Sequence, residues 1–560
     1  MSSGELDVLI IGGGVTGAGI ALDAASRGLT TGIVEAQDWA SGTSSRSSKL
    51  VHGGLRYLYQ LDFALVAEAL RERGLLLERT APHLVKAQPF LWPLKTPVIE
   101  RAYSAVGVGM YDALAQVAHR GSVPIQKHYS KKGALDLFPD IKEDALCGAI
   151  RFYDARVDDA RLVVTLVRTA VEYGAKAVSR TQVVELLHEG KRVVGAVLED
   201  LHTGKKYEVR AKHVINATGV WTEKTQSLSG DSGGLKVLAS KGIHIVVPKE
   251  KINGETGLFL RTEKSVLFII PWDRYWVIGT TDTKYVEDLR HPVADAEDID
   301  YILDHANDVL ANPLTRDDIV GVYAGLRPLL QPKVKEGESA KSTQVSREHT
   351  VAEIVPGFTA IAGGKLTTYR VMAEDAVDFA LGKERAKELP SVTTTTPLAG
   401  AAGYQAMWNN RTHLAKQMGI DLETVEHLLN RYGSEITVLA DLIEEDESLR
   451  NQIAGAEPYI RAEIVFAARY EGVLHLDDVM MHRTRLNYEV KDRGVKASEE
   501  IAGILAAELD WDEERKNKEM DLYRQRCEAQ DAAEEISSEA KAVARRLEAP
   551  EVTPMHDIEA

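Results

Sequence analysis

The sequence predicts a mixed α/β and α+β fold, and three features of the chain lead to this prediction. A β-α-β unit opens the chain, because the apolar run Leu6–Ile11 ends in glycine, a helical segment follows, and Leu29–Glu35 has the composition of a strand. Further β-branched, apolar segments lie between about residues 176 and 280, and beyond about residue 390 only helical patterns are evident. We therefore expect a Rossmann-like domain, an inserted β-sheet domain and an all-α C-terminal domain.

The first helix is expected over Val15–Arg27, where Ala18, Ile20 and Ala21 are small or apolar packing positions, and Gly28 is suited to end it. Later strands are expected at Lys176–Ser179, Arg192–Glu199, Tyr207–Ala211, His213–Asn216, His244–Val247, Val266–Pro271, Tyr275–Thr280 and Phe358–Ala362. Later helices are expected at Asp62–Arg79, Asp159–Tyr173, Asp298–Leu310 and Thr368–Leu381.

The composition of the chain changes after about residue 390, where Thr393–Gly403 has the character of a linker. Asp421 can cap a helix whose apolar face is Leu422, Val425, Leu428 and Leu429, and Gly433 can end that helix. Tyr459–Arg469 and Ala497–Leu509 are further helical runs. Residues 511–550 contain 19 charged residues, so we expect this tail to be a solvated helix or partly disordered.

Charge and cysteine content exclude several classes of protein. The formal net charge is −17, which disfavours a nucleic-acid binder. Cys147 and Cys527 can form neither a disulfide framework nor paired CxxC zinc sites, and they indicate a reducing compartment. No apolar run reaches the roughly 20 residues that span a membrane, and the N-terminus lacks the features of a signal peptide. We expect a cytoplasmic protein that can also lie on a membrane surface.

The segment Gly12–Gly17 contains the pattern G-x-G-x-x-G between the first strand and the first helix, and Glu35 ends the next strand. Gly12 permits a tight turn, Gly14 lets the backbone approach a pyrophosphate, and Gly17 allows close packing of helix on strand. The helix N-terminus then faces the anion, and Glu35 can bind ribose hydroxyls. The pattern predicts a dinucleotide site, and the acid disfavours NADP.

Pattern alone leaves FAD and NAD open. Two later strand ends, His213–Gly219 and Ala360–Thr368, favour FAD, because an extended FAD touches several strand ends whereas a one-domain NAD site does not need them. Each of these segments can also be an ordinary βα turn.

The chain contains, in order, Gly12–Gly17, Thr43–Tyr57, Lys241–Pro248, Gly279–Asp282, Gly325–Pro328 and Gly363–Arg370. Together these segments resemble the FAD-dependent glycerol-3-phosphate dehydrogenase family. The helical part, including Ala462–Tyr470 and His482–Leu486, is similar to the C-terminal cap domain of that family. The resemblance implies an FAD-binding domain of residues 1–88, 146–235 and 341–390, a substrate domain of residues 89–145 and 236–340, a helical cap domain of residues 391–515, and a charged helical or disordered tail of residues 516–560.

The resemblance further implies oxidation of sn-glycerol 3-phosphate to dihydroxyacetone phosphate by hydride transfer to flavin N5. Electrons would pass to a membrane quinone, either ubiquinone or menaquinone, in the respiratory chain. The oxidase branch of the family uses oxygen, produces hydrogen peroxide and usually carries an extra insertion in its flavin-containing half; no obvious extra block is visible here. The resemblance thus implies a peripheral enzyme on the inner face of the cell membrane, and it allows a homodimer.

Two readings from other classes remain, an NAD dehydrogenase and a flavin-binding scaffold. A yellow purified protein would contain flavin and would exclude an NAD dehydrogenase. The cations clustered in three separate parts of the sequence argue against a scaffold, which does not need a phosphate pocket. No metal site is expected.

The substrate would be a small dianion with a secondary alcohol, so the site needs cations, for which arginine is well suited, and a base. The family pattern implies substrate contacts for Arg56, Tyr57, His52, Arg347, Lys365 and Arg327, and Arg327 also serves in catalysis. His244 is the first candidate for the base, since an imidazole titrates near neutrality, and His52 is the second. For an isolated arginine, a surface ion pair is the simpler explanation.

The family pattern implies cofactor contacts along the glycine turn, the loop around residues 43–54 and the later strand ends. Lys49 could also hold negative charge on reduced flavin. The implied contact residues are Gly12, Gly14, Thr16, Gly17, Glu35, Ala36, Thr43, Ser44, Ser48, Lys49, Leu50, His52, Gly53, Gly54, Val183, Ala217, Thr218, Gly219, Gly364, Lys365, Leu366 and Thr367.

The stretch Glu100–Arg120 is apolar-leaning and flanked by arginines. A helix there would place Tyr103, Val106, Met110, Leu114 and Val117 on one side, a pattern typical both of an interfacial helix and of a core helix. Lys333, Lys335 and Lys341 could meet anionic lipid, or they could be solvated.

Overall fold

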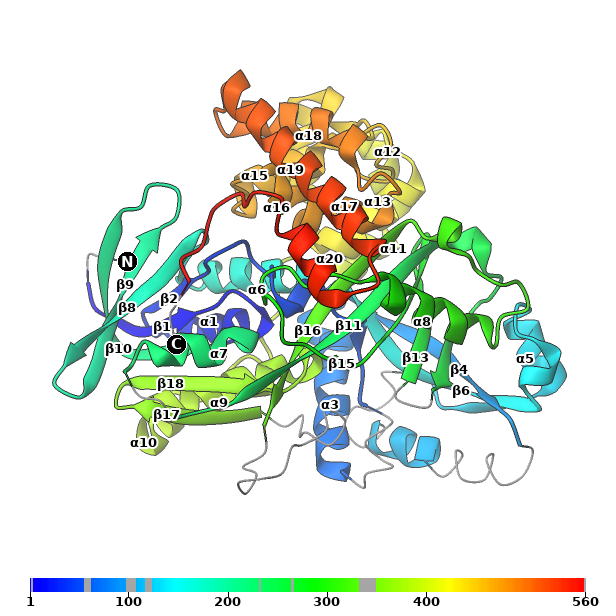
Figure 1. Ribbon diagram of the computed structural model, residues 1–560, viewed down its shortest axis with the longest axis horizontal. Helices are drawn as coiled ribbons and strands as arrows, with labels where there is room; N and C mark the ends of the chain where they lie inside the picture. Colours follow the sequence, from blue (N-terminus) through cyan, green and yellow to red (C-terminus); the bar gives the residue numbers. More distant parts are fainter. Residues whose placement is uncertain are drawn as a thin grey trace.

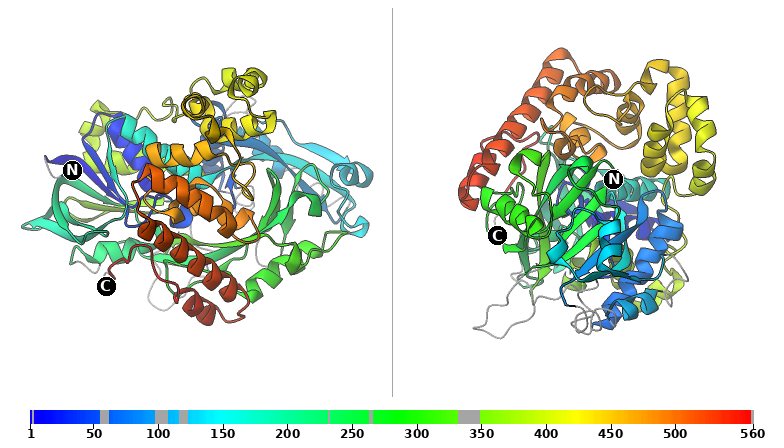
Figure 2. Two further views of the ribbon diagram at one scale, coloured as in Figure 1. Left: turned by 90° about the horizontal axis from the view of Figure 1, so that it is seen from above. Right: turned by 90° about the vertical axis from the view of Figure 1, so that its right-hand side faces the viewer.

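The computed structural model describes residues 1, 4–54, 62–96, 107–115, 123–230, 233–262, 266–331 and 349–557. Two sheets lie side by side, and the C-terminal helices form a layer over the seam between them (Figures 1 and 2). The fold class predicted from the sequence is therefore confirmed.

The first sheet carries the dinucleotide-type topology. β1 (Leu6–Ile11) lies at its centre, parallel to β2 (Thr31–Val34) and β10 (Lys206–Asn216). The order is β17-β18-β10-β1-β2-β7, and an antiparallel hairpin is attached to β10. The remaining bounds are β7 (Lys176–Val178), β17 (His349–Val355), β18 (Phe358–Gly363), and the hairpin strands β8 (Thr181–Glu189) and β9 (Arg192–Asp200).

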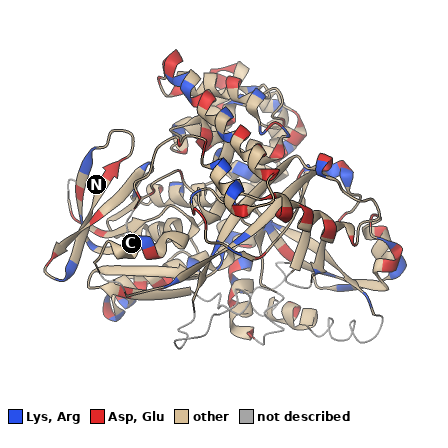
Figure 3. Ribbon diagram, viewed as in Figure 1, with Lys and Arg blue, Asp and Glu red and all other residues tan. Residues whose placement is uncertain are grey.

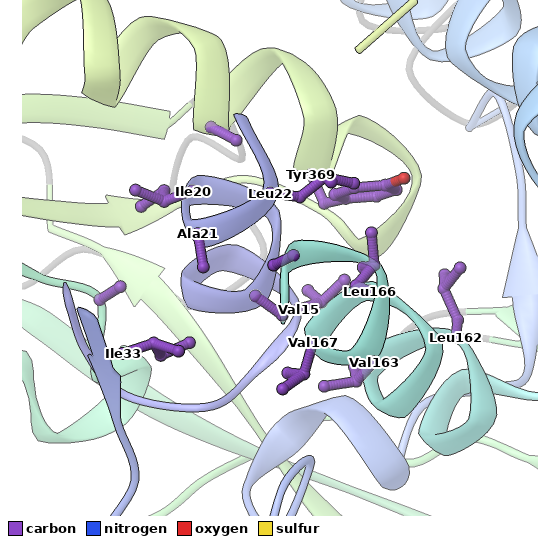
Figure 4. Close-up of a cluster of buried hydrophobic side chains, with 14 of the residues drawn as sticks. Val15, Ile20, Ala21, Leu22, Ile33, Leu162, Val163, Leu166, Val167 and Tyr369 are labelled. Carbon is purple, nitrogen blue, oxygen red and sulfur yellow. The ribbon is translucent and has the colours of Figure 1, made fainter. Parts of the chain in front are cut away.

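One face of this sheet is covered by α1 (Val15–Ser26), which packs between α6 (Asp159–Glu172) and α9 (Tyr369–Leu381). Val15, Leu166 and Tyr369, one from each helix, meet in a single buried cluster (Figure 4). Small residues on α1 permit this contact, because a Cβ at Gly19 would lie 2.8 Å from the Tyr369 ring. The small residues predicted to pack along the first helix serve this purpose.

The second sheet has the order β15-β11-β14-β13-β12-β4-β6-β3, with β16 paired to β11 and β5 paired to β6. α8 (Ala296–Asn307) packs against it and begins at a capping box formed by Asp295 and Asp298. The bounds are β3 (Leu50–Val51), β4 (Val85–Leu94), β5 (Lys127–Ser130), β6 (Gly148–Val157), β11 (Val237–Pro248), β12 (Gly257–Arg261), β13 (Val266–Trp272), β14 (Tyr275–Gly279), β15 (Thr283–Lys284) and β16 (Gly321–Leu330). Helices α3 (Phe63–Leu75), α5 (Lys131–Leu137) and α7 (Thr222–Ser227) complete this part of the chain.

Two differences from the expected organisation have a clear cause. β6 lies in the second sheet, although residues 146–235 were assigned to the FAD-binding domain, because β6 pairs with β4 along its whole length, from Val85↔Val157 to Leu94↔Gly148. His244–Val247, expected as a short strand, lies near the C-terminal end of the longer, twelve-residue β11, which pairs with β14 on one side and β16 on the other.

The C-terminal part is helical, and acidic and basic residues are interspersed along its helices (Figure 3). Asp421 caps α13 by accepting a hydrogen bond from the Thr424 amide at 2.7 Å, as predicted. Leu422 differs from the prediction, because it is the first helical residue and is 42% exposed. The helices are α10 (Lys383–Glu388), α11 (Tyr404–Asn409), α12 (Arg411–Met418), α13 (Leu422–Tyr432), α14 (Ile436–Glu445), α15 (Arg461–Tyr470), α16 (Leu476–Asp478), α17 (Leu486–Glu489) and α18 (Val495–Glu508).

The charged tail is ordered. It forms α19 (Glu513–Glu534) and α20 (Glu539–Arg546), and then a strap, residues 547–557, that returns to the first sheet (Figure 1). α19 buries Tyr523 and Cys527 against Ile501 of α18 and Leu476, so a few apolar positions are enough to dock a helix whose other faces are charged. In the described part of the chain, no helix has the length and apolar character needed to cross a membrane.

Candidate functional site

A cavity of about 340 Å³ lies where the carboxyl ends of β1, β2, β10 and β18 meet β11 and β16 of the second sheet. Crevices at the carboxyl ends of parallel strands are the usual ligand sites of such sheets, and the volume is within the range of ligand pockets. The predicted site residues that line it are Gly12, Gly14, Thr16, Glu35, Ala36, Thr43, Ser44, Ser48, Leu50, His52, Val183, Ala217, Thr218, Gly219, His244, Arg327, Gly364, Lys365, Leu366 and Thr367.

The turn between β1 and α1 is built on glycines. Gly12 has φ of 111°, and a Cβ there would lie 2.7 Å from the Ala217 carbonyl oxygen. A Cβ at Gly17 would lie 1.9 Å from the Gly12 carbonyl oxygen, so Gly17 does not line the cavity but lets the helix approach the strand. Gly14 is the N-cap of α1 and has no side chain to bond the first amides. The start of α1 therefore faces the cavity, as an anion site requires.

Glu35 follows β2 and lines the same cavity. Its carboxylate accepts hydrogen bonds from the amides of Gly13 at 2.6 Å and Gln37 at 2.8 Å, and burial raises the pKa of Glu35. A carboxylate next to a glycine turn and a helix N-terminus is the set of groups that holds the ribose and pyrophosphate of a dinucleotide. Because the cavity also touches the ends of β8, β10 and β18, its residues fit an extended dinucleotide such as FAD.

The cofactor loop, residues 41–54, connects the two sheets. The Thr43 hydroxyl donates to the Leu326 carbonyl at 2.5 Å, and Ser48 Oγ lies 2.9 Å from His244 Nε2. The backbone amide of His52 donates to Thr367 Oγ1 at 3.1 Å. Three separate hydrogen bonds thus position this loop against the second sheet and the short helical turn, Leu366–Thr368, that follows β18.

Lys49, Gly53 and Gly54 do not line the cavity, contrary to the cofactor contacts expected for them. The Lys49 ammonium is buried and pairs with Asp159 at 2.6 Å, which leaves its charge neutralised within the protein. The Gly53 amide donates to the Tyr111 hydroxyl at 2.8 Å, and Gly54 has φ of 76°. These residues therefore support the conformation of the loop and do not face the cavity.

His244 lies on β11 and its ring stacks on Tyr323 of β16, with centroids 4.9 Å apart. Burial, followed by the charges of Arg327 and Lys49, lowers the pKa of His244 well below its ordinary value. The ring is therefore neutral, and its Nδ1 makes no hydrogen bond to any described residue. Nδ1 carries a lone pair if Nε2 donates to Ser48 Oγ, and it carries the proton if Nε2 accepts from that hydroxyl.

Arg327 lies on β16, directly across from Ser240 of β11. Its guanidinium donates to Thr280 Oγ1 at 3.0 Å and to the Thr281 carbonyl at 3.1 Å, and Asp282 lies at 3.5 Å. A Cβ at Gly242 would lie 2.3 Å from Arg327 Nη2, so glycine leaves the space for the guanidinium. The geometry gives a fixed cation at the cavity wall.

Several residues at the site were not found from the sequence. Strand pairing brings Gly242 and Tyr323 beside Arg327 and His244, and Thr280 accepts a hydrogen bond from Arg327. No local pattern reveals these contacts. Met555, His556 and Asp557 of the strap also line the cavity. The backbone amide of His556 donates to Gln182 Oε1 at 2.9 Å, and Gln182 Nε2 donates to the backbone carbonyl of His556 at 2.8 Å.

Other predicted residues lie outside the described residues. These are Arg56, Tyr57, Arg347, Lys333, Lys335, Lys341, and residues 100–106 and 116–120 of the apolar stretch. Residues 107–115 form a helix in which Val108 and Tyr111 are buried, and Met110 and Leu114 pack partly buried against the same cluster. The described part of this stretch is thus a core helix.

The chain is similar to known proteins along nearly its whole length. A family model described as "FAD dependent oxidoreductase" matches residues 7–370, and one described as "C-terminal domain of alpha-glycerophosphate oxidase" matches residues 391–516. Glycerol-3-phosphate dehydrogenase 2 of Mycobacterium tuberculosis is 49% identical over 547 residues, covering 98% of this chain and 92% of that protein. The human mitochondrial glycerol-3-phosphate dehydrogenase is 36% identical, covering 93% of this chain and 73% of that protein. The X-ray structure of the glycerol-3-phosphate dehydrogenase from Bacillus halodurans complexed with FAD superimposes with a TM-score of 0.76 at 29% identity, covering 94% of this chain and 95% of that chain.

Proposed function

The chain belongs to the FAD-dependent glycerol-3-phosphate dehydrogenase family, and on that premise we propose that it oxidises sn-glycerol 3-phosphate to dihydroxyacetone phosphate and passes the electrons to a membrane quinone. Its cofactor is FAD. One observation carries the proposal: a single cavity is lined both by the glycine turn of the dinucleotide sheet and by His244 and Arg327 of the second sheet. Cofactor-binding and substrate-binding groups thus face one space.

Bound FAD supplies the hydride acceptor at N5 of its flavin. Arg327, held by Thr280 and Thr281, supplies a cation for the phosphate or for the developing alkoxide of the substrate. Lys365 adds a second positive group to the cavity wall. These two cations favour a phosphorylated substrate over a neutral alcohol, because only the phosphate supplies a counterion for them.

His244 is the proposed base for the hydroxyl proton. Ser48 holds its Nε2 and thereby fixes the ring, while burial keeps the imidazole neutral and able to accept a proton. A dianionic substrate would raise the low pKa of His244 toward the working range, because an opposite charge favours the protonated ring. The base is therefore at its most effective when substrate is bound.

The pH profile of kcat distinguishes His244 from His52, the alternative base, because kcat reports the groups that titrate in the substrate complex. We expect His244→Asn to lower kcat and to remove the acid limb of the profile, whereas His52→Asn keeps the limb. The opposite pattern would transfer the role to His52.

A quinone acceptor is supported by the names of the relatives, which are dehydrogenases, and by the absence of an obvious extra block in the FAD-binding half of the sequence. The alternative is an oxidase that makes hydrogen peroxide. Purified enzyme is assayed with glycerol 3-phosphate and either a soluble quinone or oxygen, with peroxide measured in parallel. Reduction of oxygen as fast as quinone, with stoichiometric peroxide, would favour the oxidase.

We also propose that the enzyme binds peripherally to the inner face of the cell membrane. The net charge of −17 opposes adsorption to anionic lipid, so binding has to be local, with each basic residue near the surface contributing about 1 kcal/mol. Co-sedimentation with anionic liposomes across a salt series tests this. The Lys333/Lys335/Lys341→Glu variant should sediment less than wild type, and Lys191/Lys205/Lys206→Glu, which changes exposed lysines of the β8–β10 region, should not.

A further inference from the structure

A second, smaller cavity of about 40 Å³ lies behind the cofactor loop, between that loop, β16 and the C-terminal helices. A third cavity of about 30 Å³ adjoins the same side chains. Both are lined by Arg46 of the cofactor loop, Arg526 of α19, Arg546 of α20 and His291. One water needs roughly 10–15 Å³, so the larger cavity has room for a group of several atoms.

Around these two cavities the guanidinium groups outnumber the carboxylates available to pair with them. Arg526 forms an ion pair with Asp477, and Glu551 pairs with His291. Arg46 makes no ion pair or side-chain hydrogen bond to a described residue, and Arg546 has only a long contact of 3.4 Å from Nη2 to His291 Nδ1. Burial lowers the pKa of His291 to about 4, so His291 is neutral and the charge of Glu551 also acts on Arg526 and Arg546. Three guanidinium groups thus share two carboxylates, Asp477 and Glu551, which leaves an excess of one positive charge.

Burial makes this excess costly. Arg546 is 4% exposed and Arg46 is half-buried, and burial together with the charge of Arg526 lowers the pKa of Arg546 to about 9 and that of Arg46 to about 10. A buried charge without a counterion is strongly unfavourable, and guanidinium groups pair best with carboxylates and tetrahedral oxyanions. The remaining carboxylates that line these cavities are committed: Asp38 bonds Arg483 and His482.

We propose that this arginine cavity, defined by Arg46, Arg526 and Arg546, binds a free inorganic phosphate ion. Its size suits a single tetrahedral oxyanion and leaves no room for the glycerol part of a phosphate monoester. Arg526 and Arg546 come from the tail beyond residue 516, where the C-terminal family match ends. Arg46 also lines the main cavity, so a bound phosphate would tie the C-terminal helices to the cofactor loop.

Titration of the FAD-loaded enzyme with phosphate at constant ionic strength tests the site. Arg546→Gln removes one cation that the proposed reaction does not use, and Arg545→Gln is the matched control, because Arg545 precedes it on α20 but is partly exposed and paired with Glu548. We expect calorimetry to show saturable phosphate binding that Arg546→Gln weakens by about 10- to 100-fold, the range of a charge-assisted hydrogen bond, and that Arg545→Gln leaves unchanged. Equal phosphate binding by the two variants would overturn the proposal.

Two further measurements separate the possible sources of an anion. Glycerol 3-phosphate is titrated in the same way, and an Arg546-dependent affinity for it in place of phosphate would mean that the ligand is a monoester, against the proposal. The second measurement is a selenate soak of wild-type crystals, which does not depend on whether any variant folds. An anomalous peak among Arg46, Arg526 and Arg546 is expected, whereas selenate found only beside Arg327, or nowhere, would overturn the proposal.

Discussion

Arg327 depends on residues that are distant in the sequence. Its guanidinium bonds Thr280 and Thr281 and occupies space that Gly242 leaves open, so three segments of the second sheet hold one side chain. A cation fixed in this way needs little reorganisation when an anion binds, which is the condition for strong electrostatic catalysis.

Arg327→Ala should damage turnover while FAD stays bound. Loss of one charged contact to phosphate or alkoxide costs about 2–4 kcal/mol, or about 30- to 1000-fold in kcat/KM. Steady-state kinetics and flavin absorbance measure both effects. Arg316→Ala is the control, since Arg316 is a surface residue of the same domain paired with Asp300. Unchanged kinetics would remove Arg327 from the site, and a colourless variant would indicate a structural role.

His83 is buried with no hydrogen-bond partner among the described residues at either ring nitrogen. Burial, with smaller effects of Lys86 and Arg161, lowers its pKa to about 3. The unfolded chain, in which a histidine titrates near 6.5, therefore binds more protons between pH 3 and 6.5. Stability from His83 is full above pH 6.5 and falls as the pH drops through this window.

His83→Leu should flatten the dependence of stability on pH. One proton corresponds to a slope of at most about 1.4 kcal/mol per pH unit, so the free energy of unfolding should fall less steeply between pH 6.5 and 4.5 in the variant. Denaturant titrations across that range provide the measurement. His413→Leu, which changes an exposed histidine, serves as the comparison and should keep the wild-type slope.

At the scale of elements, the strap is the most informative segment. Arg180 donates to Thr553 Oγ1 at 3.1 Å, and His556 bonds Gln182 and Glu199, so the strap is attached along the start of β8 and the end of β9. Three of its residues complete the wall of the cofactor cavity. A terminal segment held by a few hydrogen bonds and ion pairs has lower local stability than the core, and it can open without unfolding the domain.

Deletion of residues 553–560 should accelerate loss of FAD with little change in thermal stability. Contacts worth about 1 kcal/mol correspond to roughly a fivefold faster dissociation. Recovery of free flavin fluorescence after dilution gives the rate. A deletion of residues 558–560 alone keeps the cavity wall and should behave as wild type. Equal rates for the two deletions would mean that the strap does not retain the cofactor.

For the whole molecule, the C-terminal domain is fastened to the dinucleotide sheet by buried charges. Arg483 donates to both oxygens of Asp38, at 2.7 and 2.8 Å, and His482 Nδ1 lies 2.7 Å from the same carboxylate. Burial alone would raise the pKa of Asp38, but Arg483 and His482 hold it below its ordinary value. The stability from this contact is present above pH of about 3.9 and is lost as the pH falls below it.

Arg483→Leu should destabilise the protein strongly, because Asp38 remains buried without its main partner. Breaking a buried pair from one side costs about 3–5 kcal/mol, which thermal or urea denaturation detects readily. Arg469→Leu removes an exposed partner of Glu508 and should cost at most about 1 kcal/mol. If the double variant Asp38→Asn/Arg483→Leu is as unstable as Arg483→Leu, the unpaired charge is not the cause.

The sequence by itself determined the features that arise from neighbouring residues. Gly12–Gly17, β1 and the Asp421 cap are where the local pattern predicted them, because a turn, a strand periodicity or a cap involves only a few consecutive residues. Family segments also located His244 and Arg327 at the cavity.

Only the tertiary structure decided which distant residues meet. The pairing of β6 with β4, the ion pair of Lys49 with Asp159 110 residues away, and the strap over the cavity all depend on long-range contacts. A charged tail has the same local pattern whether it is solvated or docked, because burial of Tyr523 and Cys527 depends on a complementary surface supplied by other helices. The identity of that surface is a property of the whole fold, since hydrophobic and ionic contacts act through space without regard to chain order.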